Sequence, residues 1–350
     1  MKNEMVELLL NSSKRNIEKI DFNKLKNKRI LLTGCTGLIG IHLLSTLSVL
    51  QEEYNIKVYC LINSTISEIF SEIFKNFVII KGDLTEGKSI EYLLNIFAEE
   101  QYGVDYIIHS AGYAQPQKFT ENKINTILLN TKTTVDLFKL LNPNGNFLFL
   151  SSTEVYNGLY EENITENMIG VTTPEHPRSC YIDSKKCGES IVHSFKEKGY
   201  NTKIARVGFC YGPGTKKNDT RVLNNFIENA LKNGQIDMLD SGDSIRTHCY
   251  ISDTTEMLWN ILLNGKEVVY NIAGNSTISI YDLAVNVGNI LNCPVKKPKN
   301  NSNGLSGNPK IVSLSLERYF SEFGRKEFVN LEEGLYNTIE WQKQLYIQEK

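Results

Sequence analysis

A glycine-spaced turn that directly follows an apolar run constrains the fold of this chain more than any other feature. The run "RILL" leads into "TGCTGLIG", in which Gly34, Gly37 and Gly40 form a G-x-x-G-x-x-G pattern at the start of a helical pattern. Glycines at this spacing permit a tight turn and let backbone N–H groups approach a diphosphate, whose charge a helix N-terminus favours. A strand-to-helix turn without a ligand can show the same spacing, but the place of this turn after the first strand favours nucleotide binding.

Short apolar runs alternate with longer helical patterns as far as about residue 210. We expect strands at the six runs 29–34, 57–63, 77–83, 104–112, 146–153 and 203–212. Their nearly continuous hydrophobicity is typical of strands buried on both faces, in a parallel sheet covered by helices, so the sequence predicts an α/β fold. Further on, a glycine- and proline-rich loop at 212–221 precedes a helix at about 220–233, and the polar segment 297–310 is expected to be a mobile surface loop.

Composition and charge exclude several classes of protein. Hydrophobic residues make up 41% and charged residues 22% of the 350 residues, and the net charge is −2. These values are typical of a globular protein with no nucleic-acid or membrane surface, and the length allows two lobes. The seven cysteines form no C-x-x-C pair, which predicts a reduced, cytoplasmic chain without disulfides and without a metal site. No apolar run approaches the about 18 residues that a membrane span needs. Residues 1–27 are expected to form an amphipathic arm that packs on the body of the protein or on a second subunit.

The end of the second predicted strand bears on the choice of cofactor. A carboxylate there would bind the ribose 2′-hydroxyl of NAD, whereas an arginine would suit the 2′-phosphate of NADP. Ile62 and Asn63 occupy this place, so neither signal is present, and the lack of an arginine favours NAD. Asp83, at the end of the third strand, is a candidate for binding the adenine amino group and equally for a helix N-cap.

A tyrosine and a lysine stand four residues apart in "SCYIDSK", where a helical pattern begins. On a helix, Tyr181 and Lys185 would lie on the same side. An ammonium beside a phenol favours the phenolate, so we expect Lys185 to lower the pKa of Tyr181 and make it a general base. Two polar residues on a solvated helix face are the alternative. The buried run "NFLFLSSTEVY" ends in hydroxyls and a carboxylate, and the carboxyl ends of parallel strands are where such folds bind ligands.

Nine short motifs follow one another in an order that is typical of one protein family. They are "TGCTGLIG", "GDL", "HSAG", "SSTEVY", "YIDSK", "YGPG", "SIRTHCYISD", "YNIAG" and "LEEGLYNTIEW". From about residue 28 to about residue 342 the chain therefore resembles the extended short-chain dehydrogenases/reductases, which are NAD-dependent nucleotide-sugar epimerases, dehydratases and decarboxylases. The resemblance implies a Rossmann-type doubly wound parallel sheet that binds NAD over 28–210, with some later segments returning to it. It also implies a smaller C-terminal substrate-binding lobe, mainly over 211–350.

The resemblance implies roles for specific residues. Tyr181 and Lys185 would be the catalytic pair and Ser152 their hydroxyl partner, and Thr153 and Glu154 would also be catalytic. The cofactor-binding residues that the resemblance implies are Gly34, Thr36, Gly37, Leu38, Ile39, Gly40, Asn63, Asp83, Leu84, Ser110, Ala111, Gly112, Asn130, Tyr181 and Lys185.

The implied chemistry begins with oxidation of a sugar. A hydroxyl held between Ser152 and a Tyr181 phenolate would lose its proton as hydride moves to the nicotinamide, which leaves a ketone at C4 of the hexose. The ketone opens three routes: loss of a β-carboxylate, loss of water across C5 and C6, or re-reduction from the opposite face. A hydroxyl at Thr153 beside Glu154 favours a UDP-glucuronate decarboxylase-like or a dehydratase-like enzyme over a 4-epimerase, and "PRSCY" at 177–181 is closest to the decarboxylases. The alternative for Glu154 is a hydrogen-bonded residue at a strand end.

Five residues are expected to contact the nucleoside-diphosphate sugar, namely Ser152, Arg178, Phe209, Arg221 and Arg246. Arg246 matches a family arginine that contacts the diphosphate or the substrate, with a surface ion pair as the alternative. Arg178 would bind a sugar carboxylate or stabilise a loop, and Arg221 would reach a phosphate or remain solvated. Phe209 stands where many relatives have a substrate-binding asparagine, so this contact is missing or replaced.

The resemblance also implies a homodimer formed through two helices of the Rossmann domain. The amphipathic pattern of 181–195 fits such a contact, and the same apolar stripe could face the sheet instead. We expect a cytoplasmic enzyme of polysaccharide biosynthesis whose partner is a nucleoside-diphosphate sugar. A non-catalytic dinucleotide-binding protein is the remaining alternative, and the complete set of Ser152, Tyr181 and Lys185 disfavours it.

Overall fold

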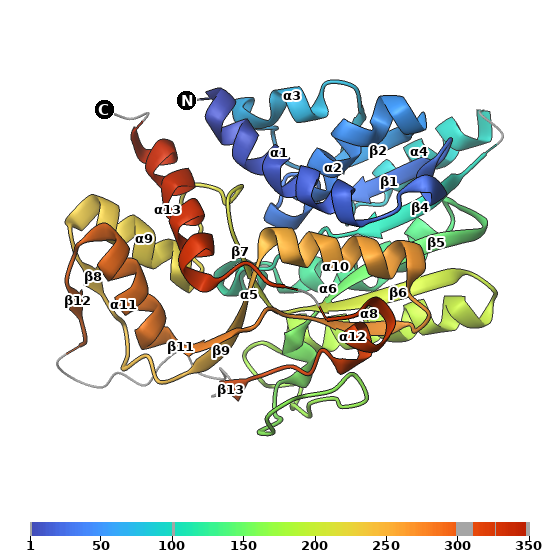
Figure 1. Cartoon of the computed structure of the whole chain (residues 1–350). Coiled ribbons are helices and arrows are strands. Elements are labelled where there is room, and N and C mark those ends of the chain that lie inside the picture. The colour runs from blue at the N-terminus through green and yellow to red at the C-terminus, as the bar shows by residue number, and fades with distance from the viewer. Residues whose placement is uncertain (1, 100–101, 299–310, 326, 348–350) are drawn as a thin grey trace.

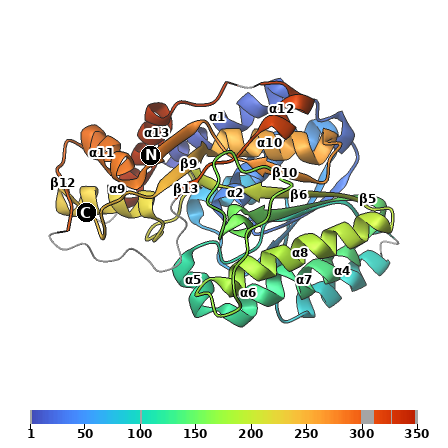
Figure 2. The same cartoon turned by 90° about the horizontal axis from the view of Figure 1, so that it is seen from below.

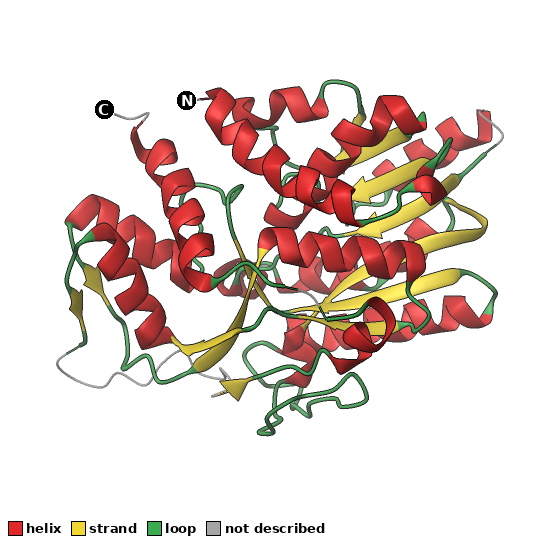
Figure 3. Ribbon diagram, in the orientation of Figure 1, coloured by secondary structure: helices red, strands yellow, loops and turns green. Residues whose placement is uncertain are grey.

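Seven apolar strands form one parallel sheet at the centre of the molecule (Figure 1, Figure 3). The computed structural model describes residues 2–99, 102–298, 311–325 and 327–347. The sheet has the order β10-β6-β5-β4-β1-β2-β3. Its strands are β1 (Arg29–Thr33), β2 (Lys57–Ile62), β3 (Val78–Lys81), β4 (Val104–His109), β5 (Leu141–Ser152), β6 (Asn201–Val207) and β10 (Val269–Ile272). The chain starts in the middle and winds outward in both directions, which confirms the predicted doubly wound Rossmann-type fold. The order reverses between β1 and β4, and the carboxyl ends of the strands open a crevice for ligands there.

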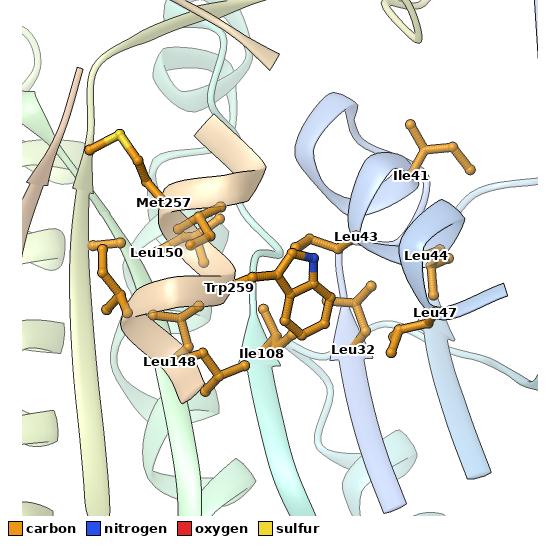
Figure 4. Packing of buried hydrophobic residues seen from close by; sticks show 14 of the residues in the cluster. Leu32, Ile41, Leu43, Leu44, Leu47, Ile108, Leu148, Leu150, Met257 and Trp259 are labelled. Atoms are coloured by element: carbon orange, nitrogen blue, oxygen red, sulfur yellow. The ribbon is translucent and has the colours of Figure 1, made fainter. Parts of the chain in front are cut away.

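Helices cover both faces of the sheet because its strands are apolar on both sides (Figure 2). Ile30 and Leu32 belong to one core cluster and Leu31, between them, to the other. Trp259 lies in the middle of the first cluster, beside Leu32 and Ile108 (Figure 4). The helices on the side of this first cluster are α1 (Lys2–Lys19), α2 (Leu38–Tyr54), α3 (Ser71–Phe74), α10 (Ile251–Asn264) and α12 (Glu317–Phe323). The helices on the other side are α4 (Lys88–Glu99), α5 (Pro116–Glu121), α6 (Lys123–Asn130), α7 (Lys132–Phe138) and α8 (Ser179–Glu197).

The N-terminal arm packs on the body of its own chain. Helix α1 lies along α2 and α10 (Figure 1). Met5 and Leu9 on its inner face are fully buried, and Asn16 Nδ2 donates a hydrogen bond to Thr255 Oγ1 of α10 at 3.0 Å. The apolar stripe of this amphipathic helix is therefore satisfied within one chain.

Most of the chain after residue 208 forms a C-terminal lobe, from which α10, β10 and α12 return to the sheet. The elements of the lobe are β7 (Phe209–Tyr211), α9 (Val222–Asn233), β8 (Ile236–Asp237), β9 (Ile245–Tyr250), β11 (Ser276–Ser279), α11 (Ile280–Leu291), β12 (Val295–Lys296), β13 (Ile311–Val312) and α13 (Leu331–Ile347). Strand β9 pairs with β7, β11 and β13. Helices α9, α11 and α13 pack over a core cluster separate from those of the sheet. The predicted helix at 220–233 is confirmed as α9.

One predicted strand is in fact two. The run 203–212 is divided at Gly208 between β6, in the parallel sheet, and β7, in the lobe. Gly208 N donates to Ile272 O at 2.9 Å. The expectation of one strand is wrong because an apolar run does not reveal that its two ends pair with different partners. Of the predicted loop 297–310, residues 299–310 lie outside the described residues. Within the described part of the chain, no helix is long and apolar enough to cross a membrane.

Candidate functional site

The turn between β1 and α2 forms one end of the site. Gly34 has a φ of +72°, and a Cβ there would lie 2.6 Å from Ala111 N, while a Cβ at Gly40 would lie 2.3 Å from Gly34 O. Neither position can hold a larger residue, because other backbone occupies the space. Gly37 is exposed, and a Cβ there would meet only Gly34 O, at 3.3 Å. The backbone at the start of α2 is thus open to a ligand, and it fits the phosphate groups of a dinucleotide.

Residues at the end of β4 lie directly against this turn. Ser110 Oγ donates to Thr33 O at 2.6 Å, and Ala111 N donates to Thr33 Oγ1 at 3.2 Å. The His109 ring is hydrogen-bonded to Thr33 Oγ1 at 2.8 Å and to Leu129 O at 2.9 Å. Burial lowers the pKa of His109 to about 4. His109 is therefore a neutral residue that joins the end of β4 to β1 and to α6, and both of its ring nitrogens are hydrogen-bonded.

Asn63 and Asp83 bind each other at the carboxyl ends of β2 and β3. Asn63 Nδ2 donates to Asp83 Oδ2 at 3.2 Å. Asp83 Oδ1 accepts from Thr85 N at 2.8 Å and from Thr85 Oγ1 at 2.7 Å. The carboxylate therefore stabilises the turn that follows β3, and its second oxygen binds Asn63. The alternative of a helix N-cap is wrong, because α4 begins only at Lys88.

Ser152, Glu154, Tyr181 and Lys185 meet where the end of β5 lies against the start of α8. Ser152 Oγ accepts from Glu154 N at 3.2 Å. Tyr181 is buried in the first turn of α8, and its hydroxyl is hydrogen-bonded to Ser152. Lys185 Nζ donates to Leu150 O at 2.6 Å and lies 5.8 Å from the centroid of the Tyr181 ring. The structure thus brings together side chains from two segments that the sequence singled out separately.

Burial, rather than the neighbouring ammonium, sets the protonation of this pair. Burial raises the pKa of Tyr181 to about 12, and the hydrogen bond with Ser152 opposes this shift only in part. Burial lowers the pKa of Lys185 to about 7, against the opposing charge of Glu189. The expectation that Lys185 lowers the pKa of Tyr181 is therefore wrong for the protein by itself. Both groups are desolvated, and the ammonium of Lys185 is directed at the Leu150 carbonyl.

Arg178 and Glu154 form an ion pair beside Tyr181. Arg178 donates from Nε to Glu154 Oε2 at 2.9 Å and from Nη2 to Glu154 Oε1, and their side chains are only 10% and 15% exposed. The ring of Phe119, in α5, stacks on Tyr181 with centroids 4.8 Å apart. The Arg178 guanidinium lies 5.1 Å from the Phe119 centroid. Phe119 was missed from the sequence because "PQKFTE" carries no motif, and only its position in the fold reveals its contacts.

Two arginines of the C-terminal lobe face the same group. The Arg246 guanidinium lies 5.5 Å from the centroid of the Phe209 ring. Burial lowers the pKa of Arg246 to about 10, although the charge of Glu154 opposes this shift. Arg221 forms an ion pair through Nε and Nη2 with Asp219. The positive charge of Arg221 opposes the rise in the pKa of Tyr181. Phe209 is 38% exposed, so its ring is accessible at the place where the resemblance implies a substrate contact.

Comparison with known proteins assigns the chain to a family. The model described as "NAD dependent epimerase/dehydratase family" matches residues 30–273. The chain belongs to this family. NAD is accordingly the cofactor, and the open glycine turn fits its phosphates.

Proteins similar in sequence to this epimerase/dehydratase family member include two UDP-glucuronic acid decarboxylases. UDP-glucuronic acid decarboxylase 1 of Xenopus tropicalis is 30% identical over 255 residues, which are 72% of this chain and 56% of the relative. UDP-glucuronic acid decarboxylase 6 of Arabidopsis thaliana is 28% identical over 318 residues, which are 88% of this chain and 87% of the relative. The chain therefore spans a little over half the length of the first relative and most of the second.

Solved structures of other proteins share the fold. UDP-glucose 4-epimerase of Thermotoga maritima aligns with a TM-score of 0.76 at 20% identity, over 91% of this chain and 99% of its own. UDP-glucuronic acid 4-epimerase of Bacillus cereus, solved with UDP-glucuronic acid and NAD, aligns with a TM-score of 0.74 at 21% identity, over 91% and 100%. At these identities the likeness shows the fold alone.

The remaining predicted residues of this family member range from buried to exposed. Asn130 Nδ2 donates to Ser184 Oγ at 2.9 Å, so Asn130 orders α8. Thr153 is buried, and Leu38 and Leu84 belong to core clusters. Ile39 is half-buried and Gly112 is exposed. Among the residues that the structure describes, no three His, Cys, Asp or Glu side chains gather in a way that could hold a metal ion.

Proposed function

We propose that the protein oxidises a nucleoside-diphosphate sugar at C4 with NAD and then removes a carboxylate from it, as a UDP-glucuronate decarboxylase does. One observation carries the proposal: the Arg178–Glu154 ion pair lies beside the hydrogen-bonded Ser152 and Tyr181 at the carboxyl end of β5. The names of the relatives given above support it, since both are decarboxylases.

The chain's own groups are placed to move a proton. NAD, when bound, accepts a hydride from the sugar carbon and can return it. Ser152 and Tyr181 would hold the hydroxyl on that carbon, and Tyr181 would accept its proton. Since the pKa of Tyr181 is about 12, the phenolate needs positive charge close by, which Arg178 and Arg221 supply in part. Lys185, with a pKa of about 7, can gain or lose a proton near neutral pH.

The ion pair favours decarboxylation over dehydration. Loss of water from a sugar needs an acid that donates a proton to the leaving hydroxyl. Both oxygens of Glu154 already accept hydrogen bonds from Arg178, so neither is placed to donate a proton. Carbon dioxide leaves without such a proton, and the enolate that remains then takes up a proton at C5. Arg178 pairs with Glu154, and the charge of Arg246 acts on the same pair. Two guanidinium groups near one carboxylate leave an excess of positive charge, which suits a substrate with both a diphosphate and a carboxylate.

Mass spectrometry of products separates the candidate reactions. The purified protein would be incubated with NAD and, in turn, UDP-glucuronate, GDP-mannose and dTDP-glucose. We expect a product from UDP-glucuronate that is lighter by about 44 mass units, the mass of carbon dioxide. A loss of about 18 units from any substrate would show a dehydratase, and a rearranged sugar of unchanged mass would show an epimerase. No product from any substrate would favour a non-catalytic dinucleotide-binding protein.

A pair of arginine variants tests the observation that carries the proposal. Arg178→Lys keeps the charge but removes the planar two-point contact with Glu154, so we expect turnover to fall by at least about tenfold. Arg325→Lys is the matched control, because Arg325 forms an exposed ion pair with Glu317. Equal turnover in the two variants would contradict a role for the Arg178–Glu154 pair.

We also propose a homodimer formed through two helices of the Rossmann domain. Ile124 and Ile127 of α6 are 69% and 39% exposed, and Val135 of α7 is 38% exposed. Helix α8 packs against β5 and β6 (Figure 2), and its residues Ile182 and Val192 are buried. The exposed side chains of α6 and α7 would therefore supply the apolar part of the contact. Light scattering that gives the mass of a single chain would refute this assembly.

A cytoplasmic location fits the chemistry of the cysteines. All seven are free thiols, which a reducing compartment favours. An enzyme there would supply nucleotide sugars for polysaccharide synthesis, and cell fractionation would test the location.

A further inference from the structure

A loop of the C-terminal lobe reaches the glycine turn of the cofactor site. The loop joins β7 to α9, and its Lys216 donates from Nζ to Thr36 Oγ1 at 3.3 Å. The same Thr36 hydroxyl is hydrogen-bonded to Ser64 Oγ at 2.8 Å. Near its other end the loop is held by Thr220 Oγ1, which donates to Gln115 Oε1 at 3.2 Å. Three segments that are far apart in sequence thus place an ammonium and two hydroxyls together.

Burial and a neighbouring ammonium both destabilise the charged form of Lys216. Burial and the ammonium of Lys118 both lower the pKa of Lys216, while Asp219 opposes them. Asp219 is itself engaged by Arg221, through two nitrogens of its guanidinium. A partly desolvated cation beside a second cation is costly, and a bound anion would stabilise this arrangement.

The position of the cluster points to a phosphate of the dinucleotide as the anion. In a Rossmann fold the glycine turn holds the diphosphate of the dinucleotide, and the end of the second strand faces the adenosine ribose. Thr36 belongs to the glycine turn, and Ser64 follows the end of β2. We propose that Lys216, Thr36 and Ser64 form a phosphate-binding site that the C-terminal lobe places over the bound dinucleotide. The phosphate is the diphosphate of NAD or, if the site also accepts NADP, the 2′-phosphate.

Through this site the C-terminal lobe would contact the bound cofactor directly. It rests on the assignment of NAD and is independent of which sugar reaction the enzyme performs. Lys216 lies in the same loop as Arg221, whose charge reaches the catalytic phenol, so one segment would contact both the cofactor and the reaction centre. The contact between Lys216 and a phosphate would slow dissociation of the cofactor between removal of the hydride from the sugar and its return.

Binding measurements without any sugar test the site. Dissociation constants for NAD⁺ and for NADP⁺ would be measured by titration calorimetry on the full chain and on Lys216→Ala. Loss of one charged hydrogen bond to phosphate should weaken binding by about tenfold or more and reduce its dependence on salt. Equal weakening for both dinucleotides would identify the diphosphate, and weakening for NADP⁺ alone would identify the 2′-phosphate. Constants within twofold of the unaltered protein for both dinucleotides would overturn the proposal.

Two further variants control for net charge and for folding. Lys217→Ala removes the same charge one residue away, where the ammonium lies 4.9 Å from the centroid of the Tyr346 ring, and its dissociation constants should change by less than about twofold. Equal weakening by Lys217→Ala would also overturn the proposal, because the effect would then be a general one of charge. Lys216→Arg keeps a cation and should retain most of the affinity, and thermal melting would verify that each variant is folded.

Discussion

A buried phenol is a weak acid, and Tyr181 depends on its surroundings to act as a base. Its ring stacks on Phe119 and is buried away from water, and this burial raises its pKa to about 12. The Ser152 hydroxyl and nearby guanidinium groups favour the ionised form. At the scale of a single residue, the proposed chemistry is therefore a balance between desolvation and positive charge.

Removal of one oxygen atom tests the proposed base. In Tyr181→Phe the ring keeps its stacking on Phe119 while the hydroxyl is lost, so we expect turnover to fall by about 100-fold or more with the fold retained. Turnover would be measured as product formed at saturating NAD and sugar nucleotide. Tyr113→Phe, in a tyrosine packed against the same cluster, is the control and should remain active. An active Tyr181→Phe enzyme would mean that another group takes the proton.

Among the elements, α1 stands out because it precedes the segment that the family model matches. It packs along α2, whose N-terminus opens the cofactor turn, and along α10. Leu9 of α1 and Ile41 of α2 both lie against Gly214, where a Cβ would be 3.3 Å and 3.2 Å from them. Helix α1 therefore supports both the cofactor helix and the loop that carries Lys216.

Shortening one side chain measures how firmly this helix is held. Leu9 is fully buried, so Leu9→Ala should lower the free energy of unfolding by about 2–4 kcal/mol, measured by urea denaturation. Glu7→Ala, on the exposed side of the same helix, should change it by less than about 0.5 kcal/mol. A loss for Leu9→Ala as small as that for Glu7→Ala would show that α1 is not part of the core.

For the whole molecule, three buried histidines link stability to pH. They lie in α2, at the end of β4 and in β9, and burial lowers the pKa of each of His42, His109 and His248 from 6.5 to about 4. His42 Nε2 is hydrogen-bonded to Pro213 O at 2.8 Å, which joins α2 to the loop that follows β7. Because the unfolded chain binds protons that the folded chain excludes, the contribution of these residues is complete above about pH 6.5. It is lost as the pH falls toward 4.

The free energy of unfolding should therefore fall steeply as the pH decreases from about 6.5 to about 4. Between pH 6.5 and 4 each buried histidine adds a slope of up to about 1.4 kcal/mol per pH unit to the free energy of unfolding. His42→Gln should reduce the slope by about this amount, as measured by urea denaturation at pH 7, 6 and 5. His193→Gln, at an exposed position of α8, should leave the slope unchanged. The same slope in His42→Gln as in the unaltered protein would contradict the buried, neutral state of His42.

Much of the fold and part of the site could be predicted because they depend on local spacing. Alternation of apolar runs and helical patterns predicted a parallel sheet covered by helices, which the structure confirms. The four-residue spacing of Tyr181 and Lys185 predicted a shared helix face, and strand ends predicted where Ser152 would lie. Residues close together in sequence have their relative positions set by backbone geometry alone. The division of one predicted strand into β6 and β7 shows the limit of that reasoning.

Spacing along the chain was thus sufficient to predict the class of fold, the glycine turn, and the placement of Tyr181 and Lys185 on one face of a helix. Packing between distant segments set the rest: Arg178 against Glu154, Phe119 beneath Tyr181, and Lys216 at Thr36. It also set the protonation of Tyr181 and Lys185, in the direction opposite to the one that their spacing suggests. The physical reason is that a pKa depends on how much water the surrounding chain excludes, and no short stretch of sequence contains that information.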